Sequence, residues 1–118
     1  MGVLARRAED AAAAELAASV ASYAVGIPQH NIVDDARGSP QTAFARQLAM
    51  YLCHVGFELS LARVAAAFGR DRSTVAYACR GIEDRRDDGQ FDLWISALEG
   101  MLHRAPSSAV SNEKKARR

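Results

Sequence analysis

The stretch FGRDRSTVAYACRGIE, residues 68–83, decides the fold that this sequence predicts. Gly69 is typical of a helix C-terminus, because glycine readily adopts the left-handed backbone that ends many helices. Two residues later, Asp71 is a favoured N-cap residue for a second helix. The apolar positions that follow have helical spacing and predict one buried face: Val75, Ala78, Cys79 and Ile82. Two short helices joined by a tight turn that contains glycine predict a helix-turn-helix.

The sequence on the N-terminal side supplies the first helix of this pair and a longer helix before it. Ser60 is a good N-cap, and the apolar residues after it repeat at i, i+3, i+4 and i+7: Leu61, Val64, Ala65 and Phe68. The longer helix is predicted to begin at Ser39 and Pro40, since a hydroxyl N-cap followed by proline is a frequent helix start. Gly56 is predicted to close it. Its predicted apolar face consists of Phe44, Leu48, Tyr51, Leu52 and Val55.

Nearer the N-terminus, an alanine-rich segment predicts a helix over residues 7–25. The sequence Gly-Ile-Pro at 26–28 is predicted to end it, because proline cannot continue a helix. The stretch HNIVDDARGSP, residues 30–40, is predicted to form a loop or short turn. Within this loop, Ile32 and Val33 are expected to fix the chain to the core.

The C-terminal side begins with a polar break, EDRRDDG at residues 83–89. A last amphipathic helix is predicted from the apolar residues Phe91, Trp94, Ile95, Leu98, Met101 and Leu102. No segment has the alternation of a strand, and no repeat is present. We therefore predict an all-α fold, with a compact helical domain over residues 1–106 and a disordered basic tail over residues 107–118.

Length and composition indicate one soluble globular domain. The chain has 118 residues, of which 49% are hydrophobic and 25% are charged. No apolar run reaches membrane-spanning length, and the start MGVLARRAED lacks the hydrophobic block of a signal peptide. We therefore expect a cytoplasmic protein that does not interact with membranes.

No pattern in the sequence indicates a catalytic centre. Cys53 and Cys79 lack metal-ligand spacing and fall on helix faces predicted to be buried, while the three histidines stand singly. There is no paired nucleophile and base, no glycine-rich phosphate loop and no group of clustered carboxylates. We therefore expect no enzyme activity, no catalytic residue, no metal, no cofactor and no small-molecule substrate.

The basic residues are concentrated at the C-terminus. The formal net charge is +1, and residues 107–118 hold four of the 15 basic side chains with a single acidic one. The remaining 11 basic and 13 acidic side chains give residues 1–106 a formal charge of −2. Because phosphate attraction needs concentrated positive charge, this negative charge predicts weak nonspecific affinity of residues 1–106 for DNA.

The second helix of the predicted pair has an outward face that suits nucleic acid. With its apolar face buried, the residues left outward or at the leading end are Arg72, Ser73, Thr74, Ala76, Tyr77 and Arg80. Backbone N–H groups at a helix N-terminus attract phosphate, and an arginine can hold guanine through two hydrogen bonds. A polar first turn is equally typical of any capped surface helix. These residues alone leave both DNA recognition and a merely structural role open.

Three motifs in order, ARQLAMYLC (45–53), LSLARVAAAFG (59–69) and RDRSTVAYACRGIE (70–83), resemble the C-terminal DNA-binding domain of the bacterial replication initiator DnaA. The resemblance extends from about Leu16 to Arg104. It implies a Trp-repressor-like helix-turn-helix fold, double-stranded DNA as partner and a nucleoid-associated location in the cytoplasm. The initiator's ATPase domain with its phosphate loop lies outside this sequence, so we expect a protein that is not itself the ATP-driven initiator.

The resemblance also implies a set of DNA-contacting residues. The base-reading turn corresponds to Asp71, Arg72, Ser73 and Thr74. The backbone or flanking contacts correspond to Arg37, Arg46, Gln47, His54 and Ala62, and the outward-facing Tyr77 and Arg80 join them. Of these, Arg46 and Gln47 are implied as phosphate contacts, and Arg37 lies near the place of the family's minor-groove arginine.

The sequence departs from the family pattern at three places. Arg72 stands where the family usually has histidine and Ser73 where it has threonine, so we expect a different preferred base sequence. The turn before Arg70 has one glycine where the family usually has two. The segment before the long helix, VDDARGSPQTAFARQ (33–47), is acidic where the family keeps a basic loop.

Two functions from different classes follow. The first is a non-enzymatic, sequence-specific DNA-binding protein that regulates replication initiation or transcription. The second is a protein-interaction adaptor that keeps this fold and binds the initiator or its regulators. The adaptor hypothesis depends on the acidic loop, the acidic segment EDRRDD (83–88) and Trp94, although its periodic position makes Trp94 equally suitable as an ordinary core residue.

Overall fold

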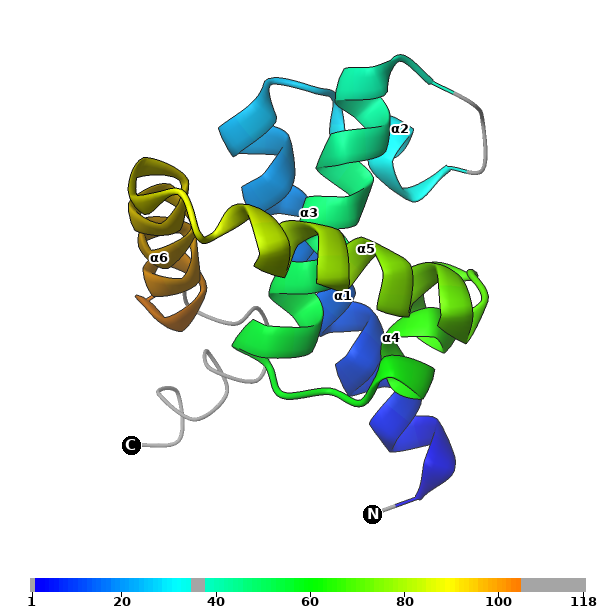
Figure 1. Cartoon of the computed structure of the whole chain (residues 1–118). Coiled ribbons are helices and arrows are strands. Elements are labelled where there is room, and N and C mark those ends of the chain that lie inside the picture. Colours follow the sequence, from blue (N-terminus) through cyan, green and yellow to red (C-terminus); the bar gives the residue numbers. More distant parts are fainter. Residues whose placement is uncertain (1, 35–37, 105–118) are drawn as a thin grey trace.

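The described part of the chain, residues 2–34 and 38–104 of a computed structural model, contains helices and no strand (Figure 1). In chain order the helices are α1 (Val3–Val25), α2 (Gln29–Val33), α3 (Pro40–Gly56), α4 (Leu61–Phe68), α5 (Arg72–Arg85) and α6 (Gly89–Arg104). The predicted all-α fold is therefore confirmed. The boundary at residue 106 and the basic tail lie outside the described residues.

The core is built around α3, which packs against each of the other five helices. Six consecutive residues of α3, from Leu48 to Cys53, are buried, because neighbours surround the middle of this helix on several sides. Ser39 begins the helix as predicted, and its side chain accepts a hydrogen bond from the backbone N–H of Thr42 at 3.1 Å. The prediction that Val55 belongs to the apolar face was wrong, since Val55 is 38% exposed near the end of the helix.

Small side chains on α1 let it lie close against α3. The buried positions of α1 include Ala14, Ala17, Ala18 and Ala21. The helix starts at Val3 rather than at the predicted residue 7, because Leu4, Ala5 and Arg6 are good helix formers. It ends at Gly26, whose φ of 84° is the left-handed conformation that favours glycine.

The segment predicted as a loop after α1 overlaps the five-residue helix α2. Ile32 is fully buried as predicted, whereas Val33 is 44% exposed and does not fix the chain to the core. Gln29 ties α2 to α1 through the Ser19 hydroxyl at 2.8 Å and the backbone carbonyl of Glu15 at 3.3 Å. Contacts with α1 and α3, rather than a periodic pattern of its own, hold this short helix.

Helices α4 and α5 form the predicted helix-turn-helix. The Ser60 side chain caps α4 by accepting the N–H of Arg63 at 3.2 Å. Gly69, with φ of 66°, ends α4, and the N–H of Arg70 donates back to the carbonyl of Ala65 at 2.9 Å. Figure 1 shows α5 crossing α3, against which it packs. Ser60 thus fixes where α4 begins, and Gly69 fixes where it ends and the turn starts.

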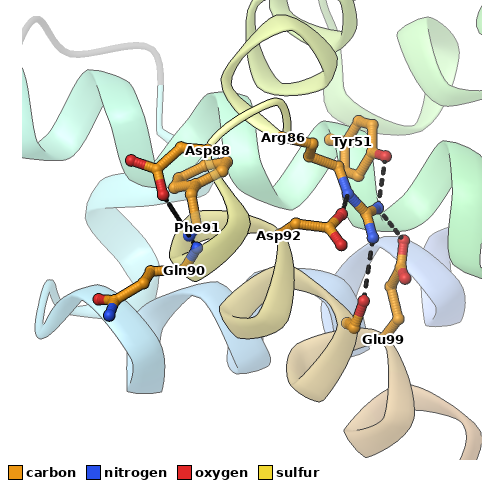
Figure 2. Close-up of polar contacts among 8 residues, drawn as sticks. Tyr51, Arg86, Asp88, Gln90, Phe91, Asp92 and Glu99 are labelled. Carbon is orange, nitrogen blue, oxygen red and sulfur yellow. Dashed lines mark hydrogen bonds and ion pairs between the residues drawn. The ribbon is translucent and has the colours of Figure 1, made fainter.

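The polar break before α6 is shorter than predicted. Helix α5 continues to Arg85, so three residues that were expected in the break, 83–85, are helical. Arg86 follows directly and holds the base of α6 (Figure 2): its guanidinium donates to Asp92 at 2.5 Å, Glu99 at 3.0 Å and the hydroxyls of Tyr51 at 2.9 Å and Ser96 at 3.0 Å. Partial burial lowers the pKa of Arg86, but its hydrogen bonds outweigh that effect and leave the pKa raised.

Candidate nucleic-acid interface

The first turn of α5 is an exposed part of the helix-turn-helix. The predicted base-reading residues Asp71, Arg72, Ser73 and Thr74 are all exposed and contiguous. The opposite face of α5, formed by Val75, Ala78, Cys79 and Ile82, is buried as predicted. The core therefore holds the helix by its apolar side and leaves its leading end open to a partner.

Backbone donors also face outward at this end of α5. Asp71 occupies the N-cap position with extended backbone, but its side chain makes no capping hydrogen bond, contrary to the expected cap. The first N–H groups of a helix have no partner within the helix, and without a side-chain cap they stay available to solvent or to a ligand. The Asp71 carboxylate, which makes no capping hydrogen bond, is exposed and can accept a hydrogen bond from a base amino group.

The outward face continues along α5. Tyr77 is 73% exposed, three and four residues beyond Thr74 and Ser73, and therefore on the same side of the helix. Arg80 is exposed one turn farther along. This face thus carries a hydroxyl pair, an aromatic ring and two arginines, Arg72 and Arg80. All of these groups can contact phosphates or base edges.

The guanidinium of Arg46 on α3 contacts the C-terminal end of α2. Its Nε donates to the carbonyl of Ile32 at 2.8 Å, and its Nη2 donates to the carbonyls of Asn31 at 2.9 Å and Asp34 at 3.1 Å. The last carbonyls of a helix lack partners within the helix and carry partial negative charge, so a cation stabilises them. Arg46 therefore fixes α2 against α3. Gln47, the other implied phosphate contact, is half-buried beside it.

Arg70, in the turn of the helix-turn-helix, reaches the same end of α2. Its Nη2 donates to the carbonyl of Asp34 at 3.0 Å. One carbonyl thus accepts hydrogen bonds from Arg46 on α3 and from Arg70 ahead of the recognition helix. Sequence reasoning did not assign this role to Arg70. No spacing signal could have shown it, because Arg70 and Asp34 are 36 positions apart.

The remaining implied flanking contacts lie at different places. His54, near the end of α3, is half-buried, and its Nδ1 lies 2.5 Å from the carbonyl of Leu59. A carbonyl only accepts, so Nδ1 carries the proton in this arrangement. Ala62 is exposed in the first turn of α4. Arg37 lies outside the described residues.

An ion pair between a buried carboxylate and a partly exposed guanidinium joins α4 to α1. Arg63 donates to both carboxylate oxygens of Asp10 on α1, at 3.0 Å and 2.7 Å. Asp10 is only 8% exposed, and the bidentate geometry is the strong form of this pair. Hydrogen bonding to Asp10 raises the pKa of Arg63. Sequence reasoning missed this pair, which joins residues 53 positions apart.

The two cysteines are buried, as predicted for their helix faces. Burial raises the pKa of the Cys53 thiol to about 12 and that of Cys79 to about 11, so both stay protonated near neutral pH. Within residues 2–34 and 38–104, no three His, Cys, Asp or Glu side chains are grouped so as to hold a metal ion.

A buried apolar face and an exposed polar first turn on the second helix are the arrangement found in helix-turn-helix domains, a class in which the second helix can enter the major groove of DNA. Residues 14–82 match the family model described as bacterial dnaA protein helix-turn-helix. The match covers more than half of the sequence, and the chain belongs to this family. Membership places the chain among DNA-binding domains related to replication initiation, and the matched domain is not a catalytic one.

Two curated relatives agree with this assignment. The chromosomal replication initiator protein DnaA 2 of Chlamydia caviae is 34% identical over 83 residues, which is 70% of this chain and 18% of the relative. The chromosomal replication initiator protein DnaA of Tropheryma whipplei (strain Twist) is 50% identical over 42 residues, or 36% of this chain and 9% of the relative. The chain thus spans less than a fifth of the length of either relative. Among the described helices, none is both long and apolar enough to cross a membrane.

Proposed function

We propose that this chain binds double-stranded DNA in a sequence-specific manner through the first turn of α5, and that it thereby regulates replication initiation or transcription without enzymatic activity. One observation carries the proposal. The apolar face of α5 is buried against the core, while all four residues from Asp71 to Thr74 are exposed at its leading end. A helix held in this way can enter the major groove with its N-terminal turn forward.

Each residue of the turn has a chemically suitable role. Arg72 is long enough to hold guanine O6 and N7 through two hydrogen bonds, and Asp71 can accept from the amino group of cytosine. The hydroxyls of Ser73 and Thr74 suit a phosphate or a base edge. Tyr77, on the same side of α5, extends the proposed contact along the groove.

The flanking contacts are proposed to orient this turn on the duplex. Arg46, Gln47 and His54 are proposed backbone contacts from α3, together with Ala62 of α4 and Arg37. Because Arg46 already donates to three carbonyl oxygens, its proposed contribution includes holding α2 in place beside the DNA. Arg80 is proposed to contact the backbone farther along α5.

Arg72→Ala tests the role of the recognition turn. It should weaken binding to a duplex with the family's box or the preferred site by about 1–3 kcal/mol and have little effect on random duplex, because one base-reading side chain is lost. The measurement is a binding titration at several salt concentrations. Arg104→Ala removes the same charge from the exposed end of α6 and is the matched control, expected to lower affinity for neither duplex.

Equal losses on both duplexes would make Arg72 a phosphate contact rather than a base-reading residue. No loss on either would remove the support for DNA recognition by this turn.

A second candidate function is an adaptor that binds the initiator or its regulators. The observation that favours it is an open groove in which Phe91 and Trp94 lie beside the acidic side chains Asp84 and Asp88. Half-exposed aromatic rings with a charged rim are typical of protein-binding surfaces.

Replacing Asp34 and Asp35 with Asn separates the two candidates. The Asp34 side chain is exposed, whereas its backbone carbonyl makes the contacts with Arg46 and Arg70, so the change should leave the fold intact. If DNA is the partner, the loss of two negative charges should strengthen duplex binding most at low salt, where screening is weakest. If the acidic loop meets a basic protein, the same variant should lose association with the initiator in a pull-down and still not bind duplex.

A further inference from the structure

An open groove lies where α5 meets α6, away from the recognition turn. It is lined by Asp84 and Arg85 of α5, Asp88 of the connecting turn, and Gln90, Phe91 and Trp94 of α6. We call these six residues the α5–α6 groove. Figure 2 shows its side of the α5–α6 junction, with Asp88, Gln90 and Phe91 next to the network around Arg86.

The floor of the groove is aromatic and already holds one cation. Phe44 stacks on Trp94 with ring centroids 6.2 Å apart, and Phe91 lies 5.7 Å from Trp94. Arg85 places its guanidinium carbon 4.3 Å from the centroid of Phe91 and 4.9 Å from that of Phe44. Aromatic faces attract cations through the ring quadrupole. The groove is therefore chemically suited to arginine and lysine side chains.

The rim of the groove has an excess of negative charge. Asp84 and Asp88 line it, against the single lining cation Arg85. The exposed Glu83 and Asp87 are their neighbours in the sequence and do not line the groove. The Asp88 carboxylate also accepts the backbone N–H groups of Gln90 and Phe91, at 2.9 and 3.2 Å, which holds it at the start of α6 (Figure 2). This combination of acidic rim and aromatic floor favours a basic segment whose side-chain stems pack on the rings while their charges meet carboxylates.

The chain carries such a segment within reach. Residues 107–118 contain Lys114, Lys115, Arg117 and Arg118 with one acidic residue. From Arg104, at the end of α6, ten residues lead to Lys114, which can span up to about 33 Å when extended. The distance back along α6 to Phe91 is about 20 Å at the rise of an α-helix. A covalent tether also raises the effective concentration of the segment to the order of millimolar, so a weak contact is sufficient.

We propose that the α5–α6 groove is a docking site for the chain's own basic segment, residues 107–118. The docked segment places its cations against Asp84 and Asp88 and over the aromatic floor, where they are withheld from other partners. This contact does not depend on DNA binding by α5, and its test contains no DNA.

A paramagnetic label on the full-length chain tests the docking. Ser111→Cys introduces a labelling site, and a nitroxide will attach there selectively because Cys53 and Cys79 are buried and their raised pKa values keep both thiols protonated. Trp94 is the only tryptophan, so its indole N–H is a single assignable NMR signal inside the groove. We expect this signal to lose most of its intensity with the oxidised label and to recover when the label is reduced.

Three variants and a salt change distinguish docking from random proximity. Asp84→Asn should restore much of the Trp94 signal, whereas Asp87→Asn, which removes the same charge outside the groove lining, should restore less. Replacing the four basic residues of the segment with Gln should restore it fully. Raising the salt from about 0.1 M to 1 M should also restore it, since the Debye length falls from about 10 Å to about 3 Å.

Several results would overturn the proposal. They are an undiminished Trp94 signal in the labelled chain, and a diminished signal that neither Asp84→Asn nor neutralisation of the segment changes. Broadening that appears only when labelled and isotope-enriched chains are mixed would assign the groove to the basic segment of a second copy instead. Because Asp84 is exposed, its variant should fold, and a well-dispersed amide spectrum checks this.

Discussion

Replacing Arg86 with Met should destabilise the domain more than any other single change at the base of α6. Arg86 donates to two carboxylates, Asp92 and Glu99, and to two hydroxyls. The side chain of Arg86 is 21% exposed, that of Glu99 is 20% exposed and that of Asp92 is 44% exposed. Met keeps most of the apolar stem, so the change isolates the loss of the guanidinium.

The expected cost lies between two known limits. Removing one partner of a fully buried ion pair costs about 3–5 kcal/mol, and an exposed pair contributes about 0.2–1 kcal/mol. Partial exposure of this network places the loss at about 2–3 kcal/mol. For a domain of about 100 residues this corresponds to a Tm lower by about 10–14 °C, at an unfolding entropy of about 2.1 cal/mol/K per residue.

Urea unfolding followed by circular dichroism measures the loss, with Trp94 fluorescence as a probe of α6. The matched control is Arg85→Met at the neighbouring position, which removes a cation from the Phe44 and Phe91 rings and should cost only about 0.5–1 kcal/mol. If the Arg86 variant lost no more than this control, the network would be a solvent-screened surface feature and the reasoning would be refuted.

Two further predictions concern the core. The contribution of the two cysteines to the free energy of unfolding should be constant below about pH 9 and fall as the pH rises toward 11, because unfolded thiols ionise near 9 while burial raises the pKa of folded Cys53 to about 12 and of Cys79 to about 11. Urea midpoints across this range check it, and a variant with both cysteines replaced by Ala should show a smaller decline. Asp10→Asn should cost about 1–2 kcal/mol in the same assay, since Asp10 is buried but its partner Arg63 is partly exposed. Glu9→Gln, the exposed neighbour, should change stability by no more than about 0.5 kcal/mol, and equal effects of the two variants would contradict a role for the ion pair.

The helix-turn-helix could be predicted from the sequence because its signals are local. Gly69 and Ser60 mark helix ends through the conformations and hydrogen bonds of single residues, and the structure confirms both. The buried face of α5 follows from spacing alone, so the exposure of the turn from Asp71 to Thr74 could be predicted as well. The same residues carry the family resemblance, which the comparisons confirm.

Local signals were insufficient where the stabilising contacts come from elsewhere in the chain. Helix α2 has five residues, too few for a periodic pattern, and its Gln29 is held by α1. The continuation of α5 to Arg85 was missed because its last residues are charged; in the structure Arg85 lies over the rings of Phe44 and Phe91. The exposure of Val55 depends on which helices cover α3, and a single helical stripe does not contain that information.

The sequence by itself therefore determined the helix-turn-helix, the exposure of the turn from Asp71 to Thr74 and the family, since caps and periodicity act within a few residues. Only the tertiary structure decided what holds these parts together. Arg46 and Arg70 meet on one carbonyl of Asp34, Arg63 finds Asp10 on α1, and Arg86 joins α3 to α6. The local sequence around an arginine does not show whether its side chain faces solvent, DNA or a carboxylate. Its partner is chosen by the packing of segments far apart in the chain, where burial strengthens the interaction.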